Sequence, residues 1–194
     1  MKAAWALAWL LVPGLAPAAA QAPGLQTWPI DPARSQAQFS VRKLWFAHER
    51  GSFPELHGTL RRTVGPNGAD LVEVDATLDV SKLEMDDRDH RARALGPDFF
   101  DQARYPSIHF DSDPFPFEEL VTGGTVSGML TLHGERLPVP LILKPSTCPR
   151  QPLACVIRVH GTIERSRFGM RDLRGVLSDK VELDLRIMLS GDGS

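Results

Sequence analysis

The stretch DKVELDLRIML, Asp179–Leu189, alternates apolar and polar residues over almost its whole length. Glu182, Asp184 and Arg186 occupy one face, and the apolar side chains of Val181, Leu183, Leu185, Ile187 and Leu189 occupy the opposite face. A period of two is the pattern of a β-strand that has one face in a core and the other in water. The stretch therefore predicts a long, half-buried strand.

The same alternation recurs along the chain. It is regular in LVEVDATLDV (Leu71–Val80) and CVIRVHGTIER (Cys155–Arg165), and it is less strict in QAQFSVRK, SIHFDS, TVSGMLTLHG and RLPVPLIL. Turn signals such as GPNG and TGG separate the runs. About eight strands at hairpin spacing predict an all-β fold, an antiparallel barrel or sandwich. Pro138 and Pro140 each lack a ladder donor, so we expect their strand to be an edge or an irregular one.

One segment has the features of a helix. MDDRDHRARAL, Met85–Leu95, begins with acidic residues and ends with arginines, which suits the helix dipole. Gly96 and Pro97 then end it. We expect a short solvated helix in a connection, directly before the adjacent pair Phe99 and Phe100.

The N-terminal 20 residues predict a cleaved signal peptide. Lys2 precedes an apolar run of about ten residues, which is too short to span a bilayer, and small residues follow up to Ala20. We expect cleavage after Ala20, export, and a single domain over residues 21–194. No later segment is apolar for long enough to predict a transmembrane helix. The formal net charge of −2 and the lack of a basic stripe make nucleic acid an unexpected partner.

Cys148 and Cys155, the two cysteines, flank a short loop in CPRQPLAC. An exported protein meets an oxidising compartment, so a disulfide is expected, with free thiols as the alternative. No histidine pair accompanies them, which gives a zinc site little support.

Motifs for catalysis, metals and nucleotides are missing from the sequence. It contains no G-x-S-x-G, H-E-x-x-H or G-x-x-x-x-G-K-[ST] pattern. Asp86, Asp87, Asp89 and His90 lie on the predicted helix and not in a looped oxygen cage, so no metal or other cofactor is expected. An enzyme that acts on a lipid head group through Lys43, Asp89 or His90 is an alternative hypothesis.

Two adjacent aromatic pairs, Trp45–Phe46 and Phe99–Phe100, fit poorly into a strand because neighbours in a strand face opposite sides. If both members are sheltered, the pair lies at a rim or in a capping loop, and we interpret it as the lip of an apolar cavity. An eight-stranded barrel is wide enough to be filled by side chains or to hold one ligand. A barrel packed shut, with a structural or interaction role, is therefore a second alternative.

Several segments together resemble a known family. They include PDFFDQARYPSIHFDS (Pro97–Ser112), VSGMLTLHGERLPVPLIL (Val126–Leu143) and GTIERSRFGM (Gly161–Met170), and the similarity extends over nearly all of the mature chain. In these motifs the chain resembles the YceI-like, polyisoprenoid-binding proteins of the bacterial periplasm. The resemblance implies an extended, lipocalin-like antiparallel β-barrel with one short helix. It also implies a homodimer and a hydrophobic channel for a long isoprenoid chain, such as that of a quinone or polyprenyl lipid, held without catalysis.

Alternation and resemblance together predict a set of ligand-binding residues. They are Phe39, Val41, Trp45, Phe46, Phe53, Leu78, Phe99, Phe100, Ile108, Phe110, Leu130, Leu132 and Phe168. Alternation predicts further inward-facing side chains at Leu60, Val74, Ala76, Ile157, Val159, Leu183 and Leu185. Lys43 and Arg93 stand where many family members have histidine, so contacts to a head group are expected to differ.

Overall fold

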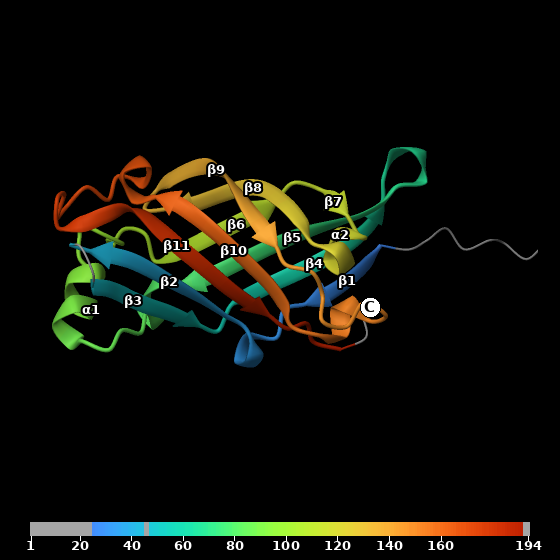
Figure 1. The fold of residues 1–194 in the computed structure, drawn as a ribbon, viewed down its shortest axis with the longest axis horizontal. Helices are drawn as coiled ribbons and strands as arrows, with labels where there is room; N and C mark the ends of the chain where they lie inside the picture. Colours follow the sequence, from blue (N-terminus) through green and yellow to red (C-terminus); the bar gives the residue numbers. More distant parts are fainter. Residues whose placement is uncertain (1–24, 45–46, 192–194) are drawn as a thin grey trace, which may run out of the picture.

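A single curled antiparallel sheet makes up most of the molecule (Figure 1). The computed structural model describes residues 25–44 and 47–191. The strand order is β1-β4-β5-β6-β8-β9-β10-β11-β2-β3, and β7 pairs with β5 outside this path. The strands are β1 (Gln26–Pro29), β2 (Gln36–Lys43), β3 (Ala47–Pro54), β4 (His57–Val64), β5 (Asp70–Asp79), β6 (Ser107–Ser112), β7 (Phe115–Pro116), β8 (Gly124–Leu132), β9 (Glu135–Leu143), β10 (Ile157–Glu164) and β11 (Leu177–Ile187).

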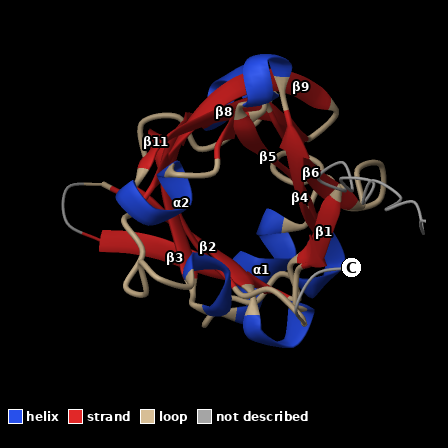
Figure 2. Ribbon diagram, turned by 90° about the vertical axis from the view of Figure 1, so that its right-hand side faces the viewer, coloured by secondary structure: helices blue, strands red, loops and turns tan. Residues whose placement is uncertain are grey.

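The all-β fold expected from alternation and the antiparallel barrel implied by the resemblance are confirmed, with more strands than predicted. Seen end-on, the strands surround a common axis (Figure 2). The sheet has eleven strands where about eight were expected. β1 and β7 are too short to show a period, and β3 reads AHERGSFP, whose first half is polar on both faces.

Short bridges close the barrel where the sheet has no continuous ladder. Ser52 of β3 pairs with Glu84, with N–H···O distances of 2.9 and 2.8 Å in the two directions. Ile30, just after β1, pairs with Leu189, just after β11. The first bridge thus joins β3 to the segment that follows β5, and the second joins the residues that follow β1 and β11.

β9 is irregular, one of the two alternatives expected from its prolines: it lies between β8 and β10 but is only partly paired with β10. It pairs with β8 from Glu135 to Leu143 but with β10 only from Leu141 to Leu143. Pro138 and Pro140 therefore fall on the part of the strand that has lost its second neighbour. The missing N–H groups are tolerated there because the edge is locally free.

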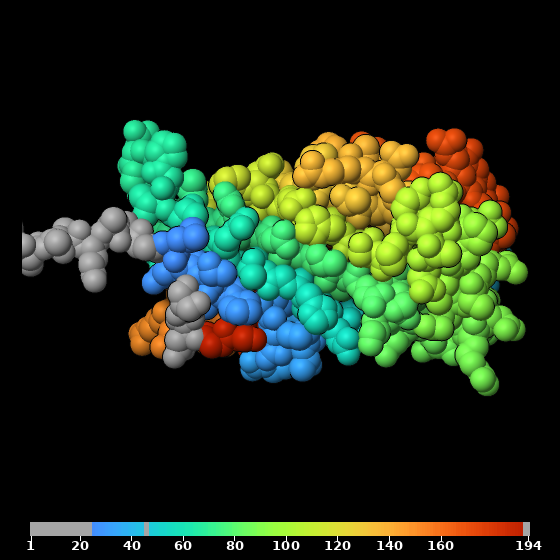
Figure 3. Space-filling model, turned by 180° about the vertical axis from the view of Figure 1, so that it is seen from behind, coloured from blue at the N-terminus to red at the C-terminus, as the bar shows by residue number. Residues whose placement is uncertain are grey.

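The predicted helix is present but shorter than expected. α1 (Arg88–Ala94) begins after Asp87, whose carboxylate accepts hydrogen bonds from the N–H groups of Asp89 and His90. This N-cap ends the extended chain and fixes where the helix starts. α1 covers one end of the barrel, and the turn at residues 65–68 projects from the surface at the other end (Figure 3). A one-turn helix, α2 (Glu119–Thr122), follows β7.

The expected disulfide between Cys148 and Cys155 is confirmed and closes the loop before β10. None of the helices in the described ranges has both the length and the hydropathy needed to cross a membrane. The predicted signal peptide lies outside the described residues.

Candidate functional site: an apolar cavity inside the barrel

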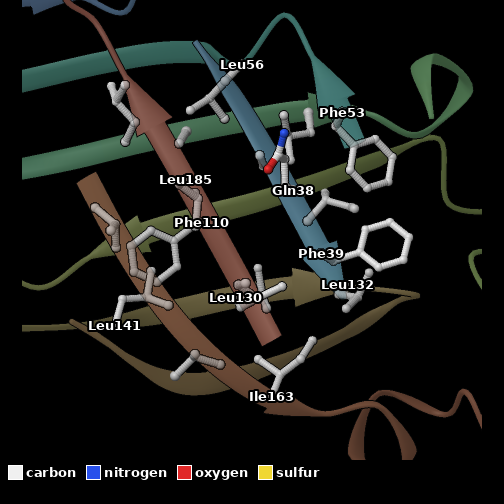
Figure 4. A pocket seen from close by; sticks show the side chains of 18 of the residues that line it. Gln38, Phe39, Phe53, Leu56, Phe110, Leu130, Leu132, Leu141, Ile163 and Leu185 are labelled. Atoms are coloured by element: carbon white, nitrogen blue, oxygen red, sulfur yellow. The ribbon is translucent and has the colours of Figure 1, made fainter. Parts of the chain in front are cut away.

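An apolar cavity runs along the interior of the barrel (Figure 4). The total space between the lining residues that no atom fills is ≈ 1570 Å³, and this includes open solvent. The part of it that is open to the centre of a water molecule has a volume of ≈ 200 Å³. Every lining residue except Gln38 and Arg165 is apolar. Cavities of this composition bind apolar ligands, with the few polar groups fixing the orientation.

The structure places most of the predicted residues on the cavity wall. Those that line it are Phe39, Val41, Phe53, Leu78, Phe99, Phe100, Ile108, Phe110, Leu130 and Leu132. The cavity is also lined by the seven further residues that alternation assigned inward, namely Leu60, Val74, Ala76, Ile157, Val159, Leu183 and Leu185. The cavity brings together side chains from strands far apart in the sequence because all their apolar faces turn to the same axis.

One predicted residue, Phe168, does not line the cavity, and two others cannot be placed. Phe168 is 2% exposed and packs in the core without lining the cavity. It lies in the short 3₁₀ turn Arg165–Phe168 that follows β10, where the two-residue period no longer assigns a face. Trp45 and Phe46 lie outside the described residues.

A cluster of three phenyl rings, Phe39, Phe53 and Phe100, forms the wall near α1. The ring centroid of Phe100 lies 5.9 Å from the ring centroid of Phe39 and 5.5 Å from that of Phe53, and both pairs are edge-to-face. This arrangement is the favourable geometry for aromatic pairs. The Phe100 N–H donates to the carbonyl of Ala94 at 2.9 Å, so the end of α1 holds the ring over the barrel.

Glycines opposite the large rings make room for them. A Cβ atom at Gly51 would lie 2.5 Å from the ring of Phe39, its register partner on β2. A Cβ atom at Gly128 would lie 2.6 Å from the ring of Phe110. Both rings therefore lie against bare backbone, and any larger residue at these positions would displace them.

Arg165 is a buried cation on the cavity wall, with 4% of its surface exposed. Its guanidinium donates to the carbonyls of Ser178, Met170, Asp172 and Leu177. Burial lowers the pKa of this group, and the nearby carboxylates of Asp179 and Asp172 act in the opposite direction. The burial of Arg165 is a feature that sequence reasoning missed.

The cavity extends over most of the barrel axis. Leu177 and Ile187, the first and last residues of β11, both line it. Ten steps at about 3.4 Å and a strand tilt of about 40° give an axial length of about 26 Å. Arg165 lies at the Leu177 end, because its Nη2 atom is 3.4 Å from the Leu177 carbonyl.

The comparison with protein families decides what kind of barrel this is. The family model described as YceI-like domain matches residues 28–189. The chain belongs to the YceI-like family. A search of curated proteins found no significant match to this chain.

Solved structures with the same fold share little sequence with this YceI-like chain. A polyisoprenoid binding domain from Saccharophagus degradans, implicated in plant cell wall breakdown, is 18% identical with a TM-score of 0.60, covering 85% of this chain and 98% of that one. Burkholderia cenocepacia BcnA is 21% identical with a TM-score of 0.60, covering 84% and 99%. A Campylobacter jejuni YCEI protein is 16% identical with a TM-score of 0.53, covering 78% and 90%. These likenesses show the fold.

The three residues of the enzyme hypothesis do not gather at the cavity of this YceI-like domain. Lys43 Nζ and His90 Nδ1 each lie 3.0 Å from a carboxylate oxygen of Glu49, beside α1. Asp89 lies exposed in the first turn of α1. None of the three lines the apolar cavity. Glu49 ties α1 to the β2–β3 hairpin, and this is the role that the geometry supports for Lys43 and His90.

A polar cluster on the outer face of the YceI-like barrel was not found from the sequence. His109 Nε2 lies 2.8 Å from Asp111 and 3.6 Å from Asp75, and His109 Nδ1 lies 2.9 Å from the Thr77 hydroxyl. Burial alone would raise the pKa of Asp111, but hydrogen bonds from His109 and Arg136 bring that pKa below its usual value. The residues come from β5 and β6, and only the register of those strands brings them together.

Proposed function

We propose that this YceI-like protein binds the isoprenoid chain of a quinone or polyprenyl lipid inside its barrel, without catalysis, and carries or stores that lipid after export. The observation that supports the proposal most directly is the apolar cavity along the barrel axis. The Saccharophagus degradans structure of the same fold is described as a polyisoprenoid binding domain, which is consistent with this reading.

The length of the cavity sets the length of chain that it would hold. A prenyl unit has four backbone carbon–carbon bonds, and at the extended rise of a polypeptide, about 3.4 Å for three bonds, it spans about 4.5 Å. A cavity of about 26 Å therefore accommodates about six extended units. Burial of each methylene is worth up to about 0.8 kcal/mol, so binding does not require a polar partner along the chain.

The first test is native mass spectrometry of the mature protein, followed by solvent extraction of what co-purifies. A stoichiometric lipid of the prenyl series would support the proposal and identify the ligand. The second test measures Kd for prenols of increasing length. If each carbon atom contributes about 0.3 kcal/mol to the binding free energy, a prenyl unit of five carbons should tighten binding by roughly tenfold. The affinity should then level off near six units, where the cavity is full. An empty protein that binds no prenol of any length would refute the proposal.

Export, periplasmic location and dimerisation belong to the same proposal. The confirmed disulfide suits an oxidising compartment. N-terminal sequencing of the protein from the periplasmic fraction should begin at residue 21, and light scattering should give the mass of two chains. The enzyme hypothesis lacks support because Lys43, Asp89 and His90 do not gather at the cavity. The packed-shut barrel is disfavoured by the size of the unfilled interior.

A further inference from the structure

A histidine lies between two carboxylates on the outer face of β5 and β6. Asp75, His109 and Asp111 alternate with residues that line the cavity, so their side chains point away from it. His109 Nε2 lies 2.8 Å from Asp111 Oδ1 and 3.6 Å from Asp75 Oδ2. The three donor atoms all lie within 4.8 Å of one another. Two neighbouring strands, green and yellow-green on the face shown in Figure 3, therefore bring one imidazole nitrogen and two carboxylate oxygens together.

The spacing of these atoms suits a small divalent cation. Nitrogen and oxygen ligands lie about 2.0–2.2 Å from Zn²⁺. Two such ligands are about 3.4 Å apart at a tetrahedral angle and about 3.0 Å apart at an octahedral angle. The two distances from His109 Nε2 bracket these values. The contact between His160 and Asp184, 3.1 Å long on the outer face of β10 and β11, differs because it includes a single carboxylate.

The two carboxylates need a positive partner. Asp75 and Asp111 are register partners on adjacent strands, and like charges directly opposite each other destabilise a sheet. Arg136 Nη2 lies 3.2 Å from Asp111 Oδ2 and balances one of the two negative charges. In the described part of the chain, the only ion-pair contact of Asp75 is the 3.6 Å distance to His109, which is a charge pair only when the ring is protonated. With a neutral ring, one negative charge is left for a bound cation to balance.

Neighbouring groups hold the ligand side chains through the atoms that a cation would not use. The Thr77 hydroxyl lies 2.9 Å from His109 Nδ1, and Arg136 donates to Oδ2 of Asp111. Nε2 of the ring and Oδ1 of Asp111 then remain for the metal. Such outer partners orient metal-bound histidines and carboxylates and fix the histidine tautomer. With a cation bound, the ring would carry its proton on Nδ1 and donate it to Thr77 Oγ1.

We propose that Asp75, His109 and Asp111 bind a first-row divalent metal ion such as Zn²⁺ on the outside of the barrel. Imidazole nitrogen favours zinc and its neighbours over magnesium and calcium, which prefer oxygen ligands. Three protein ligands leave at least one coordination position for water. The site is independent of the proposed function, because its side chains point away from the apolar cavity.

The test titrates Zn²⁺, and separately Mg²⁺, into the mature protein after dialysis against a chelator, and measures the heat of binding. We expect one Zn²⁺ to bind per chain and Mg²⁺ to bind much more weakly. Thr77→Val, which keeps the shape of the side chain, should weaken Zn²⁺ binding by about 10- to 100-fold. His109→Gln and Asp75→Asn each remove a ligand and should weaken it further. His160→Gln is the matched control and should leave Kd unchanged. All the replaced side chains are partly exposed, so the fold should tolerate the changes.

Two structural measurements separate this site from general binding to surface histidines. Zn²⁺ should raise the thermal unfolding temperature of the wild type, because the ligands join two strands, and should leave that of Asp75→Asn unchanged. Crystals soaked in Zn²⁺ should show an anomalous peak beside His109 Nε2 and the two carboxylates. The proposal is wrong if the wild type binds no Zn²⁺, if His160→Gln weakens binding as much as His109→Gln does, or if the peak lies elsewhere. Equal affinity for Zn²⁺ and Mg²⁺ would overturn the assigned class of metal.

Discussion

Replacing Ala76 by Phe should shorten the channel without removing it. Ala76 is 7% exposed and is the middle of the three β5 residues that line the cavity, between Val74 and Leu78. A phenyl ring there would divide a cavity of about 26 Å near its midpoint and leave room for about three prenyl units instead of six. At about 0.3 kcal/mol per atom, the three lost units of five carbons each amount to about 4.5 kcal/mol.

The assay measures Kd for prenols of three and six units on wild-type protein and on Ala76→Phe. We expect the six-unit prenol to bind the variant more than a thousandfold less tightly, and the three-unit prenol to bind both proteins alike. Thr125→Phe is the matched control, because it adds the same ring on the outer face of β8, next to the cavity-lining Val126. Overpacking can destabilise by about 1–3 kcal/mol, so thermal unfolding must show that the variant is folded. A folded Ala76→Phe that binds the long prenol as well as wild type does would refute the channel.

Three further predictions concern packing, covalent structure and pH. Gly51→Val should push the Phe39 ring into the cavity and weaken prenol binding, as titration of the purified variant would show; an unchanged Kd would mean that the ring moves outward instead. Replacing both cysteines by serine removes a disulfide between residues with a sequence separation of 7, and the free energy of unfolding measured in urea should fall by about 2.5 kcal/mol. The Kd for a prenol should not change, because the disulfide loop does not line the cavity. The hydrogen bond from Arg62 holds the pKa of Asp70 below its usual value, so this stabilisation is complete above about pH 4 and is lost as the pH falls through the folded-state pKa. Asp70→Asn should therefore reduce the fall in unfolding free energy between pH 5 and pH 2, and an identical pH profile would contradict the assignment.

Alternation was sufficient to predict the walls of the cavity, because a strand with one buried face carries that information in its own sequence. Ala76 and Leu78 on β5, and Leu183 and Leu185 on β11, could be assigned inward before any contact was known. The prediction ended where the period ends. Phe168 lies in a 3₁₀ turn, and its place in the core depends on how that turn packs.

The polar features depended on register and loop conformation, which local sequence does not contain. Asp75 and His109 meet because β5 and β6 pair as they do. Arg165 is buried because the chain from Met170 to Ser178 folds back to surround its guanidinium with carbonyls. A run such as RSRFGM has the same composition whether its first arginine is solvated or enclosed. The signal available in the sequence was the position of Arg165, directly after a strand with regular alternation.

The prolines of β9 affect how readily two copies of the protein associate through their strand edges. From Glu135 to Pro140 this strand has β8 on one side and no ladder on the other. An unpaired strand edge is a template on which a second molecule can add a strand, and this is a common first step toward aggregation. Pro138 and Pro140 have no N–H to offer to an added strand. Pro138 and Pro140 thus make this side of β9 a poor surface for self-association.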